Sequence, residues 1–122
     1  MKSTILAIDD EQELLEAVRQ SLELDGYTVL AFNRPEDGIH CYELHWRAID
    51  LVLLDYVMPG MTGDLVFECL QRVNPDVKVL LLTGCEDHVA HTMFTKGLRG
   101  YLQKPFYLAD LTARVKEEIA TE

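Results

Sequence analysis

The sequence predicts an α/β fold in which a doubly wound, five-stranded parallel sheet of order 2-1-3-4-5 is covered by five helices. Short apolar runs alternate with helical patterns along the chain, which favours parallel strands joined by right-handed crossovers. The runs at 50–54 and 77–82 are the densest in apolar residues, as is typical of strands covered on both faces, and the run at 3–8 is expected to lie with them in the interior. The weaker runs at 27–32 and 99–103 are expected at the two sheet edges.

The individual elements are marked by their apolar runs and by the residues that start or end helices. The expected strands are 3–8, 27–32, 50–55, 77–82 and 99–103. The expected helices are about 11–25, one starting near Pro35, 65–73, a short one around 89–94, and 108–119. Asp25-Gly26 should end the first helix, because glycine adopts the left-handed conformation that often follows a helix. Pro35 fits the first turn of the second helix, with Asn33 or Arg34 near its cap.

Apolar residues at helical spacing predict which helix faces are buried. In the first helix they are Leu14, Leu15, Val18 and Leu22. In the third helix they are Leu65, Val66, Cys69, Leu70 and Val73. In the last helix they are Leu108, Leu111, Val115 and Ile119.

Composition indicates one globular domain, expected to span residues 1–122. With 48 % hydrophobic residues, a chain of 122 residues can bury roughly two-thirds of the surface that it exposes when unfolded. The 21 acidic and 11 basic residues give a net charge of −10, which argues against a broad surface for nucleic acid or anionic lipid. We find no apolar stretch of the roughly 20 residues that a membrane span needs, and no secretory signal pattern. Three widely spaced cysteines, an odd number, indicate free thiols in a reducing cytoplasm.

Polar residues follow four of the apolar runs. Asp9 and Asp10 follow the first run, Asp55 ends the run at 50–55, Thr83 follows 77–82, and Lys104 follows 99–103. Because the carboxyl ends of parallel strands meet at one edge of a sheet, these side chains should converge. That edge is where open α/β sheets bind ligands.

Three clustered carboxylates require a counter-charge. Two of them about 4 Å apart repel by roughly 4 kcal/mol at an effective dielectric constant of 20. A hard divalent cation with oxygen ligands fits, and Mg²⁺ is expected because it retains waters and recruits phosphate oxygens. The alternative is that Asp9 and Asp10 merely cap the helix that begins near Glu11. That alternative would be preferred for an isolated pair, but Asp55, Thr83 and Lys104 at neighbouring strand ends favour a site.

Asp55 stands alone at the end of a central strand and is a candidate nucleophile. A carboxylate can attack phosphorus and form an acyl phosphate. The metal and Lys104 would then neutralise charge on the transferred group. Thr83 can donate to a phosphoryl oxygen, and Gly84 leaves room for the backbone to approach it.

Four segments resemble the signature segments of response-regulator receiver domains of two-component signalling, which share the flavodoxin-like fold of the chemotaxis regulator. They are Ile8-Asp9-Asp10, residues 54–63 (LDYVMPGMTG), Leu82-Thr83-Gly84 and residues 101–106 (YLQKPF). The resemblance implies that Asp55 is the phosphoacceptor and that Asp10 ligates the metal directly. It implies that Asp9 acts through metal-bound water and that the Val57 carbonyl completes the protein ligands.

The resemblance also implies roles for the last two strands. Lys104 would pair with the phosphoryl group, and the Lys104-Pro105 peptide would be cis. Thr83 and Tyr101 would form the switch pair: Thr83 moves towards the phosphoryl group, and the Tyr101 ring turns into the space that is released. The face formed by 86–103 and the last helix would then change shape.

By this resemblance, the domain is a signalling switch and not an enzyme, apart from catalysing its own phosphorylation and dephosphorylation. It would accept the phosphoryl group from a histidine kinase or phosphotransfer protein and control an output domain or partner protein. No direct nucleic-acid binding or membrane contact is expected, and a phosphorylation-dependent dimer is one option. The chain could be a complete regulator or the N-terminal receiver of a longer one; a hybrid kinase is disfavoured, because receivers usually come late in those chains.

We expect this domain to control a slow cellular response. In receivers generally, the side chains two places after the phosphoacceptor and two places after the switch threonine flank the water that attacks the acyl phosphate. Here they are Val57 and Cys85, neither of which is an acid or an amide. We therefore expect a phosphoryl group that lasts minutes or longer, which suits an output such as transcriptional control.

Two other classes of protein share features of this predicted site. Haloacid-dehalogenase-like phosphatases also use acids, a threonine and a lysine, but they place the nucleophile after the first strand in an Asp-x-Asp arrangement and usually carry a cap. This chain has Asp9-Asp10 there and no room for a cap. A flavodoxin-like cofactor binder would need a hydroxyl- and glycine-rich phosphate loop, which the loops after the first and third strands lack.

Overall fold

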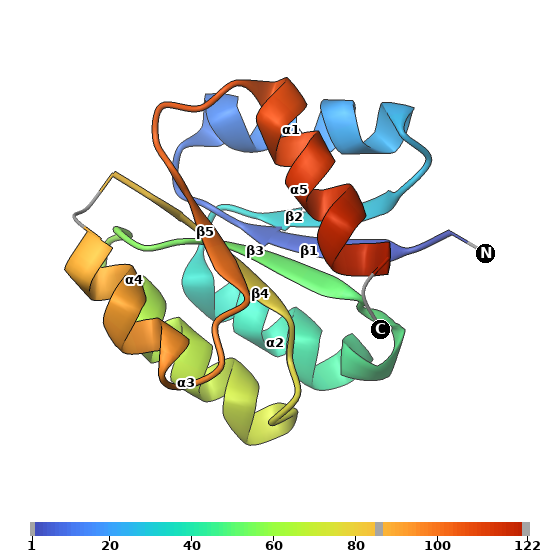
Figure 1. The fold of residues 1–122 in the computed structure, drawn as a ribbon. Helices are drawn as coiled ribbons and strands as arrows, with labels where there is room; N and C mark the ends of the chain where they lie inside the picture. The colour runs from blue at the N-terminus through green and yellow to red at the C-terminus, as the bar shows by residue number, and fades with distance from the viewer. Residues whose placement is uncertain (1, 85–86, 121–122) are drawn as a thin grey trace.

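The computed structural model describes residues 2–84 and 87–120 and contains a parallel sheet of order β2-β1-β3-β4-β5, as the sequence predicts (Figure 1). The strands are β1 (Thr4–Ile8), β2 (Thr28–Phe32), β3 (Leu51–Asp55), β4 (Val79–Thr83) and β5 (Gly100–Gln103). The helices are α1 (Gln12–Leu24), α2 (Pro35–His45), α3 (Gly63–Val73), α4 (Asp87–Phe94) and α5 (Leu108–Ala120). A 3₁₀ turn, η1 (Trp46–Ala48), follows α2 and has no counterpart in the predicted elements.

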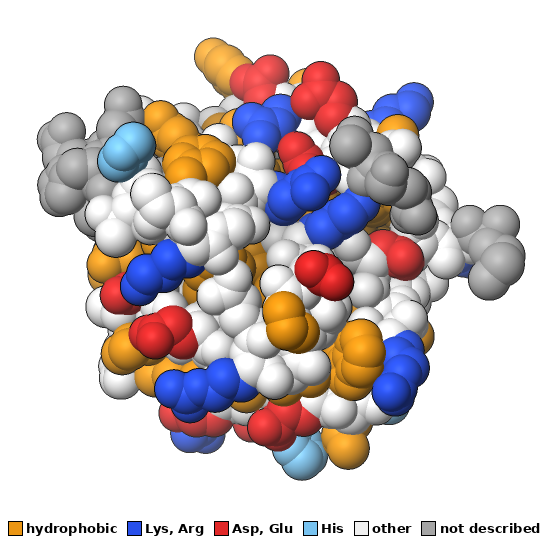
Figure 2. Space-filling view, turned by 60° about the horizontal axis from the view of Figure 1, so that its bottom comes forward, with side chains coloured by type: hydrophobic (Ala, Val, Ile, Leu, Met, Phe, Trp, Pro, Cys, Tyr) orange, Lys and Arg blue, Asp and Glu red, His pale blue; other side chains and the backbone are white. Residues whose placement is uncertain are grey.

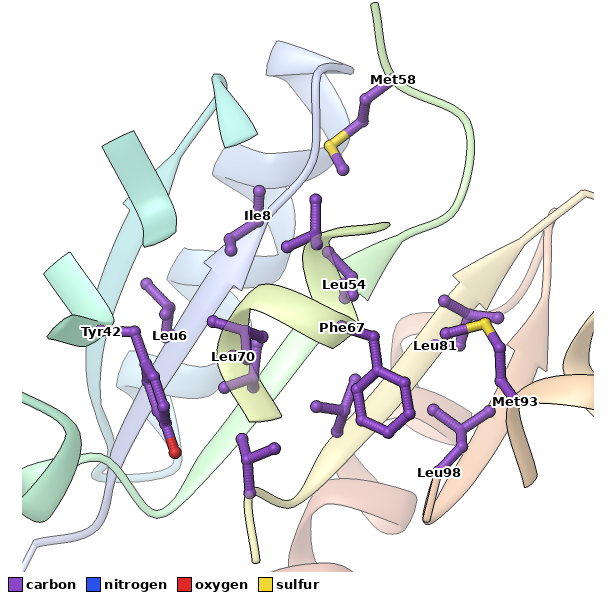
Figure 3. Close-up of a cluster of buried hydrophobic side chains, with 14 of the residues drawn as sticks. Leu6, Ile8, Tyr42, Leu54, Met58, Phe67, Leu70, Leu81, Met93 and Leu98 are labelled. Atoms are coloured by element: carbon purple, nitrogen blue, oxygen red, sulfur yellow. The ribbon is translucent and has the colours of Figure 1, made fainter. Parts of the chain in front are cut away.

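The sheet separates two helical layers, with α1 and α5 on one face and α2, α3 and α4 on the other (Figure 1). Successive residues of a strand point to opposite faces, so each strand contributes to both layers. In β1, Ile5 and Ala7 pack in the cluster that contains the buried residues of α1 and α5. Leu6 and Ile8 pack in the other cluster, with residues of α2 and α3 (Figure 3). This burial on both faces explains why the interior strands are apolar along nearly their whole length.

The ends of the first two helices agree with the prediction. Asp25 caps the C-terminus of α1, and Gly26 after it has a φ of 95°, a conformation that costs glycine little. Arg34 is the N-cap of α2, and Pro35 occupies its first turn.

The buried face of α3 differs from the predicted one. Leu65 is 47 % exposed, whereas Phe67, which lies outside the predicted stripe, is 1 % exposed and packs in the core (Figure 3). The helix begins at Gly63, and its buried residues are Gly63, Val66, Phe67 and Leu70. This is the i, i+3, i+4, i+7 pattern counted from the true first residue. The prediction is confirmed for Val66 and Leu70 but was wrong for Leu65, because it started the stripe two residues too late. Likewise, Leu14, Leu108 and Ile119 are only partly buried at the rim of the other cluster.

No helix among residues 2–84 and 87–120 combines the length and the apolar character that crossing a bilayer would require. Figure 2 shows acidic and basic side chains interspersed over the face that it displays, without a broad basic patch.

Candidate functional site

The register of the sheet brings together the strand ends that the sequence singled out. Ile8 pairs with Leu54, so Asp9 and Asp55 follow at the same level of neighbouring strands. On the other side, Thr83 pairs with Gln103, which places Lys104 just beyond Thr83. The Lys104 backbone N–H donates to the Thr83 carbonyl over 2.7 Å. The three buried polar or charged residues of the described chain, Asp9, Asp55 and Thr83, all lie at this carboxyl edge.

Three carboxylates meet at the carboxyl edge. One oxygen from each of Asp9, Asp10 and Asp55 can be chosen so that all three lie within 4.8 Å of one another. Asp9 is 2 % exposed and Asp55 is 4 % exposed, while Asp10 is more open to solvent. This set of hard oxygen donors suits Mg²⁺, which binds one or two carboxylates and keeps several waters. The donor set therefore fits the predicted metal.

The loop after β3 is held against the site by a glycine. Gly63 donates its N–H to the Tyr56 carbonyl over 2.6 Å, and a Cβ at this position would lie 2.8 Å from the Tyr56 Cα. Only glycine permits this approach, which folds the loop carrying Val57 back beside Asp55. The Val57 side chain is 60 % exposed.

The Lys104 ammonium group lies among carboxylates. Its Nζ is 3.0 Å from Asp9 Oδ2 and 3.2 Å from Asp55 Oδ1, and it also forms an ion pair with Glu11 Oε2. Burial opposes the charged form of Lys104. Hydrogen bonds to Glu11 and Asp9 and attraction to Asp9 and Asp55 outweigh burial, so the pKa of Lys104 is raised and the group is cationic at neutral pH.

In contrast to Lys104, the surroundings of Asp55 disfavour its charged form. Burial, followed by repulsion from Asp9, raises the pKa of Asp55 from 3.8 to about 7. Attraction by Lys104 offsets only part of this rise. Without a cation, Asp55 is therefore close to half-protonated at neutral pH. A bound divalent cation would favour the carboxylate form that a nucleophile needs.

The two carboxylate oxygens of Asp9 have different partners. Its Oδ1 accepts a hydrogen bond from the Glu11 N–H over 2.9 Å, just before α1, but the N-cap residue is Glu11 and no side chain forms a cap hydrogen bond with the first turn. Its Oδ2 faces Lys104. Glu11 itself is the N-cap residue of α1. The sequence pattern marks Glu11 only as the start of a helix. The signal that could have identified it is its position directly after two acids.

The two residues of the predicted switch pair have different surroundings. Thr83 is 1 % exposed, and the position after it, Gly84, has open space where a Cβ would be. The Tyr101 ring packs edge-to-face against Phe94 of α4, with centroids 6.1 Å apart and planes at 68°. The Lys104-Pro105 peptide is cis, as the resemblance implied. Cys85, the second residue of the lifetime prediction, lies outside the described residues.

Comparison with known proteins is consistent with this geometry. The family model "Response regulator receiver domain" matches residues 5–116. The response regulator MprA of Mycobacterium leprae is 36 % identical over 115 residues, covering 92 % of this chain and 49 % of that protein. The chain spans about half, or less, of the length of the curated relatives that it matches.

Solved structures agree with the family match. A response regulator receiver domain from Clostridium thermocellum superposes with a TM-score of 0.91 at 30 % identity, covering 97 % of this chain and 94 % of that one. The structure described as the BeF₃-activated DrrB receiver domain has a TM-score of 0.86 at 29 % identity, covering 98 % and 99 %.

Proposed function

This chain belongs to the response regulator receiver domain family of two-component signalling, and from that premise we propose that Asp55 is its phosphoacceptor. The observation that carries the proposal is the buried Asp55 carboxylate facing two other acids and the Lys104 ammonium at the carboxyl edge. The proposal treats residues 1–122 as one receiver domain in the cytoplasm. The free thiols of Cys41 and Cys69 support a reducing compartment.

The proposed donor is a phosphohistidine of a histidine kinase or phosphotransfer protein. An Asp55 oxygen attacks the phosphorus, the O–P bond forms as the P–N bond breaks, and the electron pair remains on the imidazole. Lys104 pairs with the transferred group, and the Thr83 hydroxyl donates to one of its oxygens.

Asp10, Asp55 and the Val57 carbonyl would hold Mg²⁺, with Asp9 contributing through a water. The metal supplies positive charge that offsets the charge of the phosphoryl group. Thr83 and Tyr101 would then carry the change to the face formed by α4, β5 and α5, which controls an output domain or partner. The edge-to-face contact of Tyr101 with Phe94 supports a link between the site and α4.

A loading experiment tests this function. We expect acetyl phosphate with Mg²⁺ to add one phosphoryl group to the wild-type chain, measured by intact-protein mass spectrometry. Asp55→Asn should abolish the addition. Asp37→Asn, which removes an exposed acid on α2, should load like wild type. Equal loading of Asp55→Asn and wild type would overturn the assignment.

We further propose a slow output such as transcriptional control, in line with the exposed, apolar Val57. Such a side chain cannot orient the attacking water by a strong hydrogen bond. After loading and removal of the donor, phosphate release should therefore take minutes or longer. Val57→Asn combined with Cys85→Glu should accelerate release. Decay of the wild-type phosphoryl group within seconds, or an unchanged rate in the double variant, would contradict the proposal.

A further inference from the structure

The Lys104 ammonium is shared by three carboxylates, and Glu11 is the one that the proposed mechanism does not use. Asp9 and Asp55 contact Lys104 Nζ from inside the site. Glu11 Oε2 contacts the same nitrogen from outside, with a side chain that is 57 % exposed. An ammonium group has three N–H donors, so these three carboxylates can occupy all of them.

The position of Glu11 is set by backbone hydrogen bonds on both sides of it. Its N–H donates to Asp9 Oδ1 over 2.9 Å, and its carbonyl accepts the Leu15 N–H over 2.9 Å as the first bond of α1. These bonds hold the Glu11 Cα between the acid pair and the helix. The fold of this turn therefore places Glu11 within reach of Lys104.

Phosphorylation changes what Lys104 must bind. A phosphoryl group carries three acceptor oxygens and a charge of about −1.5 to −2 at neutral pH. The contact with Asp55 Oδ1 is replaced first, because that carboxylate becomes the acyl phosphate. Lys104 can donate a second hydrogen bond to the phosphoryl oxygens only if it also releases Asp9 or Glu11. Asp9 is buried, and its carboxylate would be left uncompensated. Glu11 can be rehydrated, so releasing it costs least.

We propose that Glu11 is a positioning residue that acts through Lys104: it holds the ammonium in the unphosphorylated domain and competes with the phosphoryl group for it when Asp55 is loaded. This inference rests on the proposed function of Asp55. Glu11 thereby favours the unphosphorylated state and lowers the rate at which Asp55 is phosphorylated.

Glu11→Gln tests the inference in two assays. Because an exposed ion pair is a weak interaction, we expect a gain of about two- to fivefold in the initial rate of loading by acetyl phosphate. We expect a similar gain in affinity for beryllofluoride with Mg²⁺, measured by ¹⁹F NMR. Glu13→Gln removes the same charge from an exposed position of α1 and should leave both quantities at the wild-type level.

The Lys104→Gln background separates release of the lysine from simple repulsion between Glu11 and an anionic donor. If Glu11 acts through Lys104, Glu11→Gln should produce no gain in that background. An equal gain in both backgrounds would show repulsion alone and overturn the inference, as would no gain in the wild-type background. Failure of the wild-type chain to load or to bind beryllofluoride would instead refute the proposed function, and the inference with it.

Discussion

At the carboxyl edge of the sheet, Asp9 and Asp55 are almost fully buried, whereas at the amino edge Asp50 is exposed beside the start of β1. Asp50 Oδ2 accepts the Thr4 N–H over 2.8 Å, and the Asp50 N–H donates to the Thr4 carbonyl over 2.8 Å. At the amino edge an aspartate therefore links β1 to the start of β3 by hydrogen bonds, whereas at the carboxyl edge Asp9 and Asp55 repel each other.

This difference shows where the fold gives up stability for function. The acids at the carboxyl edge are compensated by Lys104 only in part, since the pKa of Asp55 is still raised to about 7. Perturbed acids of this kind gather at functional sites. Substitution of an acid should therefore have opposite effects on stability at the two edges, and the following predictions examine that contrast.

The largest effect is expected for Asp55→Asn in the metal-free protein. The folded-state pKa of Asp55, about 7, lies above its ordinary 3.8, so the folded state binds more protons between these values. The contribution of Asp55 to stability should thus be greatest below about pH 4, fall as the pH rises from 4 to 7, and stay low above that. The variant removes this penalty and should be more stable by about 1–3 kcal/mol at pH 8, with little gain at pH 4.

Urea unfolding at the two pH values measures this effect. Asp50→Asn is the matched control. The new amide oxygen can still accept the Thr4 N–H, and the wild-type Asp50 carboxylate is exposed and not repelled by a buried neighbour. Equal destabilisation of Asp55→Asn at pH 4 and pH 8 would refute the view that charge repulsion dominates at the carboxyl edge.

An intermediate effect is expected from Mg²⁺. A ligand that binds only the native state should stabilise the protein by about 0.4–1.4 kcal/mol when its concentration is one to ten times the dissociation constant. The melting temperature should rise during titration. Asp10→Asn should abolish the rise and leave the metal-free protein as stable as wild type or more so. Asp50→Asn should respond like wild type, and a flat wild-type titration would contradict the metal assignment.

The smallest effect is expected at the amino edge. Asp50→Ala removes the acceptor of the Thr4 N–H and should destabilise the protein by about 0.5–1 kcal/mol, because water can replace the lost partner at this exposed position. Chemical denaturation at neutral pH measures it. A gain in stability would show that the two edges do not differ as proposed.

The repeating pattern of the chain was enough to predict most of the fold. Local signals predict the strand order, the apolar runs of β3 and β4, and the helix ends at Asp25-Gly26 and Pro35. The buried face of α3 did not, because its phase depends on a helix start at Gly63. That start is set by the close packing of Gly63 against Tyr56, which hydrophobic spacing does not reveal.

The sequence by itself determined which chemical groups the site contains. Acids, a threonine and a lysine end successive apolar runs, and parallel pairing requires that such ends meet at one edge. Only the tertiary structure decided which of those groups form ion pairs and how their pKa values shift. Lys104 meets Glu11 and Asp9 across more than ninety residues of chain, and burial raises the pKa of Asp55 to about 7. Distance and desolvation arise only when the strands are assembled, so no local pattern records them.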